Sequence, residues 1–366
     1  MFRRLGSLLC LITLSACSFF QQPDHFEARE ITFSELNNWP SDNHSEALQS
    51  FLMSCPALSK TSRNATTGSN IAIPLPVWKS LCQDAVKSAI IPAEARQFFE
   101  RRFVPFRISN NRKEHGLFTG YYEPVLYGSR HKGGDFIYPL YAAPAELKNS
   151  KPYFTRQEID EGRLAGRRLE LVWVDDPVML FFMQIQGSGR VRLTNGSEIR
   201  LGYADQNGHG YVGIGKLFGE EGLLPKDQIN FFTLRQWLYD HPNQAIAMMQ
   251  RNPSYVFFKE YQGPGPIGSV GVALTPRRSL AVDNRYMPYG LPVYLETKLP
   301  AEPAREAVNF QRLMVTQDTG GAIRGPVRGD IFFGAGDEAE YMAGYMKGRG
   351  VYSLLVPREV ADQLRP

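Results

Sequence analysis

The chain has 366 residues, of which 21% are charged, and its formal net charge is +4. Loss of residues 1–16 would remove two arginines and lower the net charge from +4 to +2. No basic run of the kind that a nucleic-acid site needs occurs elsewhere in the sequence. Nucleic acid is therefore excluded as a partner. The length exceeds the usual size of one domain and predicts two.

The amino end predicts an export signal and a lipid anchor. Two arginines precede the apolar run Leu8–Leu14, which is too short to cross a bilayer as a permanent helix. Residues 14–17, Leu-Ser-Ala-Cys, resemble a bacterial lipobox, which implies a signal peptide of residues 1–16 and lipid on Cys17. An ordinary secretory signal with a chance cysteine is the alternative. Ser18, where an inner-membrane retention signal has Asp, implies an outer-membrane lipoprotein that faces the periplasm.

Two cysteines remain once Cys10 is removed with the signal and Cys17 carries lipid. Cys55 and Cys82 would lie in a compartment that permits disulfides, so they either pair or remain two buried thiols. Neither has a zinc-type ligand spacing nearby, so the sequence indicates no metal, and no cofactor is implied.

The first part of the chain is predicted to be a polar tether followed by helices. Residues 17–38 are mixed and polar, which is typical of a tether. Helical periodicity follows at 45–54, 77–87 and 93–103.

From Gly116 the pattern changes to short β-rich runs separated by glycine. Residues 191–201 predict a hairpin around a type I′ turn at Asn195-Gly196, and Thr155 with Glu158 predicts a capped short helix. Further helices are expected at 226–239 and 244–250 and from Asp337 to about Lys347, and a strand is expected at 351–356. Gly263–Pro266 reads as a linker. Many short strands with interspersed helices favour β-barrels with added helices over alternating βαβ units.

The densest cluster of glycine and acid lies at Gln317–Gly336. It places Asp318 and Asp330 a short loop apart, and a pair of acids in unequal environments is what glycosidic bond cleavage normally needs. Asp330 is followed by Ile331–Phe333, so apolar neighbours would keep its carboxyl protonated as a general acid, with Asp318 as the ionised partner. Two turn acids in a Gly-rich hairpin are the alternative.

A resemblance to a known family favours the catalytic interpretation. The segments Asp318–Ile323 and Asp330–Gly336 resemble the carboxyl-terminal signature of the membrane-bound lytic murein transglycosylase A family. Other matches, spread over residues 116–350, are Phe118–Pro124, Asp176-Pro177, Gln184–Arg190, Gly202–Gly208, Asn252–Tyr255 and Leu274–Asp283. So many matches in order are specific, whereas any one of them would be weak.

The resemblance implies a mainly β fold with added helices, in which one β-barrel domain is inserted into another. The outer domain would be a double-psi β-barrel made of residues 39–126 and 263–366, the insert would span 127–262, and the glycan would lie in a groove between them. The catalytic acid of the family matches Asp330, and Asp318 and Asp283 match two supporting acids of the same site.

The implied activity is that of a lyase in murein turnover and cell-wall organisation. It breaks the β-1,4 bond between N-acetylmuramic acid and N-acetylglucosamine without water, because the sugar's own C6 hydroxyl attacks C1 and leaves a 1,6-anhydro end. Asp330 would act first as acid and then as base. An inverting hydrolase that uses two aspartates, or a lipoprotein that only binds peptidoglycan, are the alternatives.

Several polar residues and glycines are candidate sugar ligands, although strand packing is the alternative role for those on strands. They are Thr119, Tyr122, Glu123, Gln184, Gln186, Ser188, Gly320 and Gly321. The expected partners are peptidoglycan glycan strands and, through lipid on Cys17, a membrane; cell-wall synthesis proteins are further candidates.

Overall fold

The computed structural model describes residues 23–60, 71–91, 93–301 and 306–365. The expected signal peptide, the expected lipidation site Cys17 and the first residues of the expected tether lie outside these ranges. Within them, no helix is long and apolar enough to cross a membrane.

The tether predicted for residues 17–38 is wrong from Phe26 onward. Residues Phe26–Glu30 form strand β1, which runs antiparallel to β2 (Phe103–Asn110). Short 3-10 turns follow at Phe33–Glu35 and Trp39–Ser41. Because β1 is a short and largely polar edge strand, its composition resembles that of a tether.

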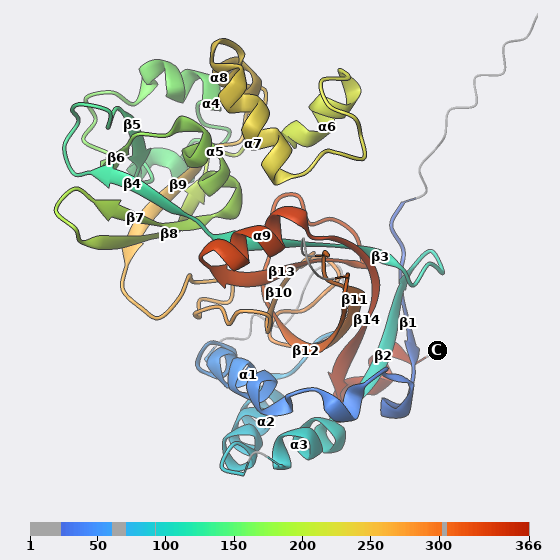
Figure 1. Ribbon diagram of the computed structural model, residues 1–366. Coiled ribbons are helices and arrows are strands. Elements are labelled where there is room, and N and C mark those ends of the chain that lie inside the picture. Colours follow the sequence, from blue (N-terminus) through green and yellow to red (C-terminus); the bar gives the residue numbers. More distant parts are fainter. Residues whose placement is uncertain (1–22, 61–70, 92, 302–305, 366) are drawn as a thin grey trace, which may run out of the picture.

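Three helices follow: α1 (His44–Leu58), α2 (Leu75–Ser88) and α3 (Glu94–Arg102). They confirm the three helices predicted from periodicity. Their apolar faces meet in an aromatic cluster, in which the ring of Phe51 lies 5.8 Å from that of Phe98. Figure 1 shows all three helices together on one side of the larger sheet.

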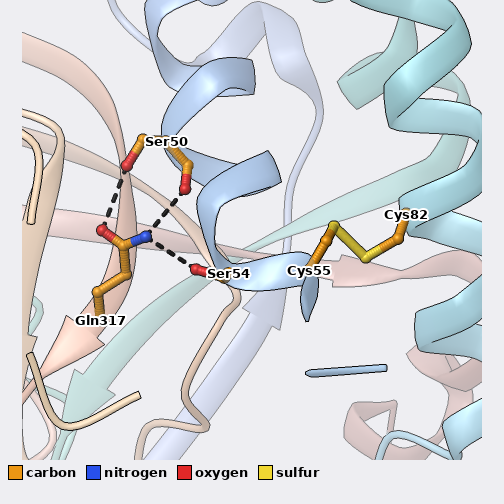
Figure 2. Close-up of a disulfide and its surroundings, with 5 residues drawn as sticks. All are labelled: Ser50, Ser54, Cys55, Cys82 and Gln317. Atoms are coloured by element: carbon orange, nitrogen blue, oxygen red, sulfur yellow. Dashed lines mark hydrogen bonds between the residues drawn. A yellow bond between two sulfur atoms is a disulfide. The ribbon is translucent and has the colours of Figure 1, made fainter. Parts of the chain in front are cut away.

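A disulfide joins α1 to α2. The Cys55 and Cys82 sulfurs are bonded, with their Cα atoms 5.7 Å apart. Of the two alternatives that the sequence left open, the structure has the bridge. Figure 2 shows the bridge and, next to Cys55 on α1, the side chain of Ser54.

Six of the eight described strands of the larger sheet close into a ring. Around the ring they are β14 (Lys347–Pro357), β11 (Pro292–Lys298), β12 (Asn309–Asp318), β10 (Ser279–Val282), β13 (Arg328–Ala335) and β3 (Gly116–Glu123), which pairs again with β14. Two pairings are parallel, β10 with β12 and β13 with β3. This mixed closed ring agrees with the expected double-psi β-barrel. Strands β1 and β2 extend the sheet beyond β14.

The barrel interior is apolar, and one buried ion pair ties it to the amino-terminal segment. Arg278, just before β10, is almost fully buried. Its guanidinium donates to Asp42 at 2.9 and 3.0 Å, to Glu46 and to the Leu313 carbonyl. A buried cation is tolerated here because every side of it meets a carboxylate or a carbonyl.

The second sheet contains every described strand from Val125 to Tyr261. Its order is β5 (Tyr138–Tyr141), β6 (Glu170–Val174), β4 (Val125–Ser129), β7 (Ser188–Leu193), β8 (Glu198–Gln206) and β9 (Val256–Tyr261). A bridge between Ala142 and Phe258 brings the two edges together, as in a barrel. Strand β4 begins two residues before the predicted boundary at Tyr127. The prediction of a mainly β fold with added helices is confirmed.

The hairpin predicted at 191–201 is present as β7 and β8, but its turn type is wrong. A type I′ turn needs a positive φ at both central residues, whereas only Gly196, with φ +83°, has one. The amide of Gly196 donates to the Leu193 carbonyl, and the Ser197 carbonyl accepts from the Leu193 amide. This is the longer hairpin loop, in which a glycine in the left-handed region follows the turn.

Helices pack beside the second sheet. They are α4 (Arg156–Glu158), which continues as a π-turn at Ile159–Arg163, α5 (Pro177–Gln186), α6 (Ile214–Glu220), α7 (Phe231–Asp240) and α8 (Pro242–Gln250), with a 3-10 turn at Ala145–Asn149. The capping box of Thr155 and Glu158 is confirmed. Helix α7 starts later than predicted because Asn230 caps it.

The chain passes between the two sheets twice. Strand β3 of the barrel leads directly into β4 of the second sheet, and Figure 1 shows the two as one long run. The return runs from β9 to β10. Helix α9 (Asp337–Tyr345) packs against β3 and β13 and meets α7 of the second part, and a final 3-10 helix spans Arg358–Leu364. The two sheets are therefore joined by packing as well as by chain.

Candidate active site

A polar row crosses four neighbouring strands of the barrel. Asp318 at the end of β12 lies opposite Ala281 on β10, and Ala281 lies opposite Asp330 on β13. Asp330 in turn lies opposite Thr119 on β3, and the Thr119 hydroxyl donates a hydrogen bond to its carboxylate. Residues directly opposite each other point to the same face of a sheet. The barrel therefore brings Asp318, Asp330 and Thr119 onto one face.

Asp330 has a polar environment, which differs from the apolar one that its sequence neighbours suggested. The Arg328 guanidinium forms an ion pair with its carboxylate and donates to the Thr119 hydroxyl at 2.9 Å. Ile331 and Phe333 point away into the core. The expectation of an apolar surrounding is wrong because alternate residues of a strand face opposite sides. The same alternation would have identified Arg328, which sequence reasoning missed.

Asp318 is the acid whose environment disfavours charge. Burial raises the pKa of its carboxyl, although it accepts hydrogen bonds from the Ser269 amide at 3.0 Å, the Ser269 hydroxyl at 2.8 Å and the Tyr121 hydroxyl at 3.0 Å. The assignment of Asp318 as the ionised partner stays a prediction, with burial opposing the charge and these hydrogen bonds favouring it. Its contacts come from two segments far from it in the chain, around Ser269 and around Tyr121, which no local pattern reveals.

The strand that ends at Asp318 is held from behind by helix α1. Gln317 points to the opposite side of β12, where its amide donates to the Ser50 carbonyl at 2.9 Å and the Ser54 hydroxyl at 2.8 Å. Figure 2 shows these bonds next to the Cys55–Cys82 bridge. The amino-terminal helices thus fix the residue that precedes a site acid.

Asp283 is fully buried and holds the loop between β12 and β13. Burial acts to raise the pKa of this carboxyl, but hydrogen bonds from the Arg285 guanidinium and from the Gly325 and Arg285 amides outweigh it and lower the pKa. The Gly325 amide lies 2.7 Å from the carboxylate. The same loop carries Gly320 and Gly321, so Asp283 sets the position of the predicted sugar-binding glycines.

Tyr211 brings the second part of the chain to the site. A Cβ added to Gly321 would lie 3.5 Å from the Tyr211 Cβ, which is an ordinary van der Waals distance, so the two residues are neighbours. Partial burial and the negative charge of Asp330 raise the pKa of the Tyr211 phenol. Tyr211 therefore faces the acid from across the interface. Sequence reasoning missed it, because nothing local to Gly210-Tyr211 indicates that position.

Four of the predicted sugar ligands are buried inside the protein. Glu123 forms ion pairs with Arg190 and Arg200 of the second sheet. The Tyr122 hydroxyl donates to Glu340, and Gln184 and Ser188 are also buried. The structure gives all four packing or pairing contacts instead of an open site.

Gln186 is half-buried and accepts a hydrogen bond from the Tyr122 amide at 3.1 Å. Of the other predicted ligands, Thr119 bonds to Asp330, and Gly320 and Gly321 lie in the loop that follows Asp318. The described residues contain no group of three or more His, Cys, Asp or Glu placed to hold a metal ion.

Known proteins match both parts of the chain. The family described as the MltA specific insert domain matches residues 117–259, and the 3D domain matches residues 278–356. A curated relative, membrane-bound lytic murein transglycosylase A of Vibrio cholerae, is 33% identical over 237 residues, which is 64% of this chain. The matched region spans 63% of that relative's length.

Solved structures match over nearly the whole chain. A membrane-bound lytic murein transglycosylase from Agrobacterium tumefaciens is 34% identical, with a TM-score of 0.81, and the match covers 93% of this chain and 100% of that one. Escherichia coli MltA with bound chitohexaose is 26% identical, with a TM-score of 0.68 and coverage of 92% and 93%. The chain therefore belongs to the membrane-bound lytic murein transglycosylase A family.

Proposed function

We propose that this protein is a lytic transglycosylase that cleaves the β-1,4 bond between N-acetylmuramic acid and N-acetylglucosamine in peptidoglycan and forms 1,6-anhydro ends. The observation that carries the proposal is the position of Asp330, a partly exposed acid that Arg328 and Thr119 hold on the face of the barrel opposite to Ile331 and Phe333. The E. coli relative that was solved with chitohexaose supports a glycan substrate.

Asp330 serves as the acid and then as the base. As an acid it protonates the leaving oxygen, and as a carboxylate it afterwards accepts the proton of the C6 hydroxyl that attacks C1. The Arg328 cation stabilises the carboxylate formed between these two steps.

The other polar residues support this proton transfer. Asp318 and Tyr121 form a hydrogen-bonded pair beside the acid, and the Tyr121 ring packs 5.2 Å from Phe332 on the acid's own strand. The pair places the oxygen atoms of Asp318, which carry negative charge density, near the oxocarbenium-like transition state and so stabilises its positive charge. Asp283 keeps the Gly320–Gly321 loop in place. No second carboxylate acts as a nucleophile, since the attacking hydroxyl belongs to the sugar and has a high effective concentration.

The test is mass spectrometry of murein digested by the full chain. We expect anhydromuramic ends from the wild type and none from Asp330→Asn, while Asp337→Asn, an exposed acid of α9, serves as the matched control and retains activity. Reducing ends without anhydro sugars would instead identify a hydrolase. Unchanged cleavage by Asp330→Asn would remove the assignment of the acid.

The proposed location is the periplasmic face of the outer membrane, with lipid on Cys17. The curated relatives are named membrane-bound. Strand β1 begins nine residues after Cys17, which limits the link between lipid and barrel to about 30 Å at about 3.3 Å per residue. The barrel therefore works close to the membrane surface, where cell-wall synthesis proteins are accessible as partners.

A further inference from the structure

A hollow of about 570 Å³ lies on the barrel outside the row of acids. The end of β11 and the start of β14 form its walls, together with Leu299 and with Tyr345 from the end of α9. Tyr345 is 40% exposed and its ring stacks on that of Phe232 at 4.6 Å, so helix α7 of the second part supports this wall. The proposed mechanism does not use any of these residues.

Unpaired positive charge surrounds the hollow. Lys298, Lys347 and Arg349 all line it and are exposed, and within the described part of the chain none of the three has a carboxylate partner. Among the described residues of the lining, the one carboxylate is that of Glu296, and Arg107 neutralises it at 2.9 Å. Three cations without counter-charge around a concave surface favour an anionic ligand.

The Glu296 carboxylate is further occupied by the Asn37 amide at 2.7 Å, so its second oxygen is also engaged. The side-chain amides of Asn309 and Gln311 also line the hollow and can donate hydrogen bonds to a carboxylate. The hollow thus combines cations, amide donors and an aromatic wall, which suits a small anionic peptide better than a bare inorganic ion.

The hollow is adjacent to the proposed catalytic acid. Lys347 on β14 lies opposite Thr119 on β3, and Thr119 lies opposite Asp330. Two strand spacings separate Lys347 from Asp330, which corresponds to about 10 Å. A chain of three or four residues, at about 3.3 Å each, bridges that distance from a sugar held at Asp330.

We propose that the hollow binds the carboxylates of the peptide stems that murein carries on its N-acetylmuramic acid residues. This inference rests on the proposed function, because it takes murein as the substrate. In a peptide-bearing strand the lactyl carboxyl of each N-acetylmuramic acid is bound in an amide, so the backbone is uncharged and the peptide stems supply the anionic groups. Lys298, Lys347 and Arg349 would hold them while Asp330 acts on the glycan, and the enzyme would prefer peptide-bearing strands.

The test compares two substrates, peptide-bearing murein and glycan strands stripped of peptide by an amidase. Stripping frees the lactyl carboxylate of each N-acetylmuramic acid, but this group stays beside its ring and does not span the distance of about 10 Å to the hollow. Lys298→Glu and Arg349→Glu reverse one exposed charge each. We expect each to raise KM for peptide-bearing murein about fivefold, the effect of about one exposed ion pair, with KM for stripped glycan unchanged. Lys79→Glu, an exposed lysine of α2 far along the chain from the hollow, is the matched control and should change neither value.

Pelleting with insoluble murein tests the site without any cleavage, so it separates this inference from the proposed function. Wild type and Asp330→Asn should both pellet with peptide-bearing murein, and the two charge reversals should weaken this. Equal losses on both substrates, or no loss on either, would overturn the proposal. Charge reversals that abolish pelleting with anionic phospholipid vesicles but leave both murein assays unchanged would assign the hollow to a membrane surface and also overturn it.

Discussion

Removal of the Arg328 side-chain charge gives the most direct test of how the site works. Arg328 bonds both the Asp330 carboxylate and the Thr119 hydroxyl, the latter at 2.9 Å. A hydrogen bond to a charged group contributes about 1.5–3 kcal/mol, and Arg328 pairs with the carboxylate, the form that Asp330 takes after it has given its proton to the leaving oxygen. Arg328→Met should therefore lower kcat by about 10- to 100-fold, since about 1.4 kcal/mol corresponds to tenfold.

The assay is the release of anhydromuropeptides from murein at saturating substrate, combined with a melting temperature for each variant. Arg328→Lys should recover part of kcat because it restores the charge without the paired donors. Arg130→Met, which removes an exposed arginine paired with Glu260 in the second sheet, is the matched control. A kcat for Arg328→Met within twofold of the wild type, at unchanged stability, would refute the assigned role.

Four further changes test other parts of the structure. Arg278→Met leaves the buried Asp42 carboxylate without its partner and should lower the free energy of unfolding, measured in urea, by about 3–5 kcal/mol. A decrease below about 1 kcal/mol would contradict the buried network. Burial raises the pKa of the Asp318 carboxyl above its unfolded value, so the stability that this group contributes at low pH is lost as pH rises through the folded pKa. The variant Asp318→Asn should therefore be more stable than the wild type at about pH 8 but not at about pH 3. The opposite trend in the unfolding midpoints would exclude this reasoning. Tyr211→Ala should raise KM for murein about tenfold, whereas Tyr211→Phe retains the ring and most of the affinity. Equal KM values for the two variants would argue against contact between the ring and the sugar. Cys17→Ala should leave activity on isolated murein intact and move the protein from the membrane to the soluble fraction, so retention on membranes would refute the lipid anchor.

Periodicity and turn chemistry were sufficient for much of the fold. The helices at α1, α2, α3, α7 and α8 follow from apolar spacing, and the capping box at Thr155 appears as expected. Strand β1 was missed because a short edge strand carries little apolar signal, and its partner β2 lies more than seventy residues away in the chain. The hairpin turn at Gly196 was wrong in type because Asn-Gly fits more than one loop geometry.

The site was predictable where its parts share a strand or a loop. Asp330 and Asp318 were identified from one Gly-rich segment. Arg328 could have been identified as well, because residues two apart on a strand face the same side and Arg328 lies two residues before Asp330. The environments of the acids were not predictable, because Asp318 depends on Ser269 and Tyr121 from other strands and loops. Tyr211 reaches the acid only because the second sheet packs against the barrel. This contact depends on tertiary structure, so the local sequence does not predict it.

The position of the disulfide links the amino-terminal helices to the proposed chemistry. The bridge closes a sequence separation of 27 residues, for which the loss of chain entropy in the unfolded state corresponds to about 3.5 kcal/mol. That constraint holds α1 where Ser50 and Ser54 bind Gln317, as Figure 2 shows. Because Gln317 and Asp318 are consecutive residues that point to opposite faces of β12, fixing one fixes the other. The helices outside the barrel therefore belong to the support of the site.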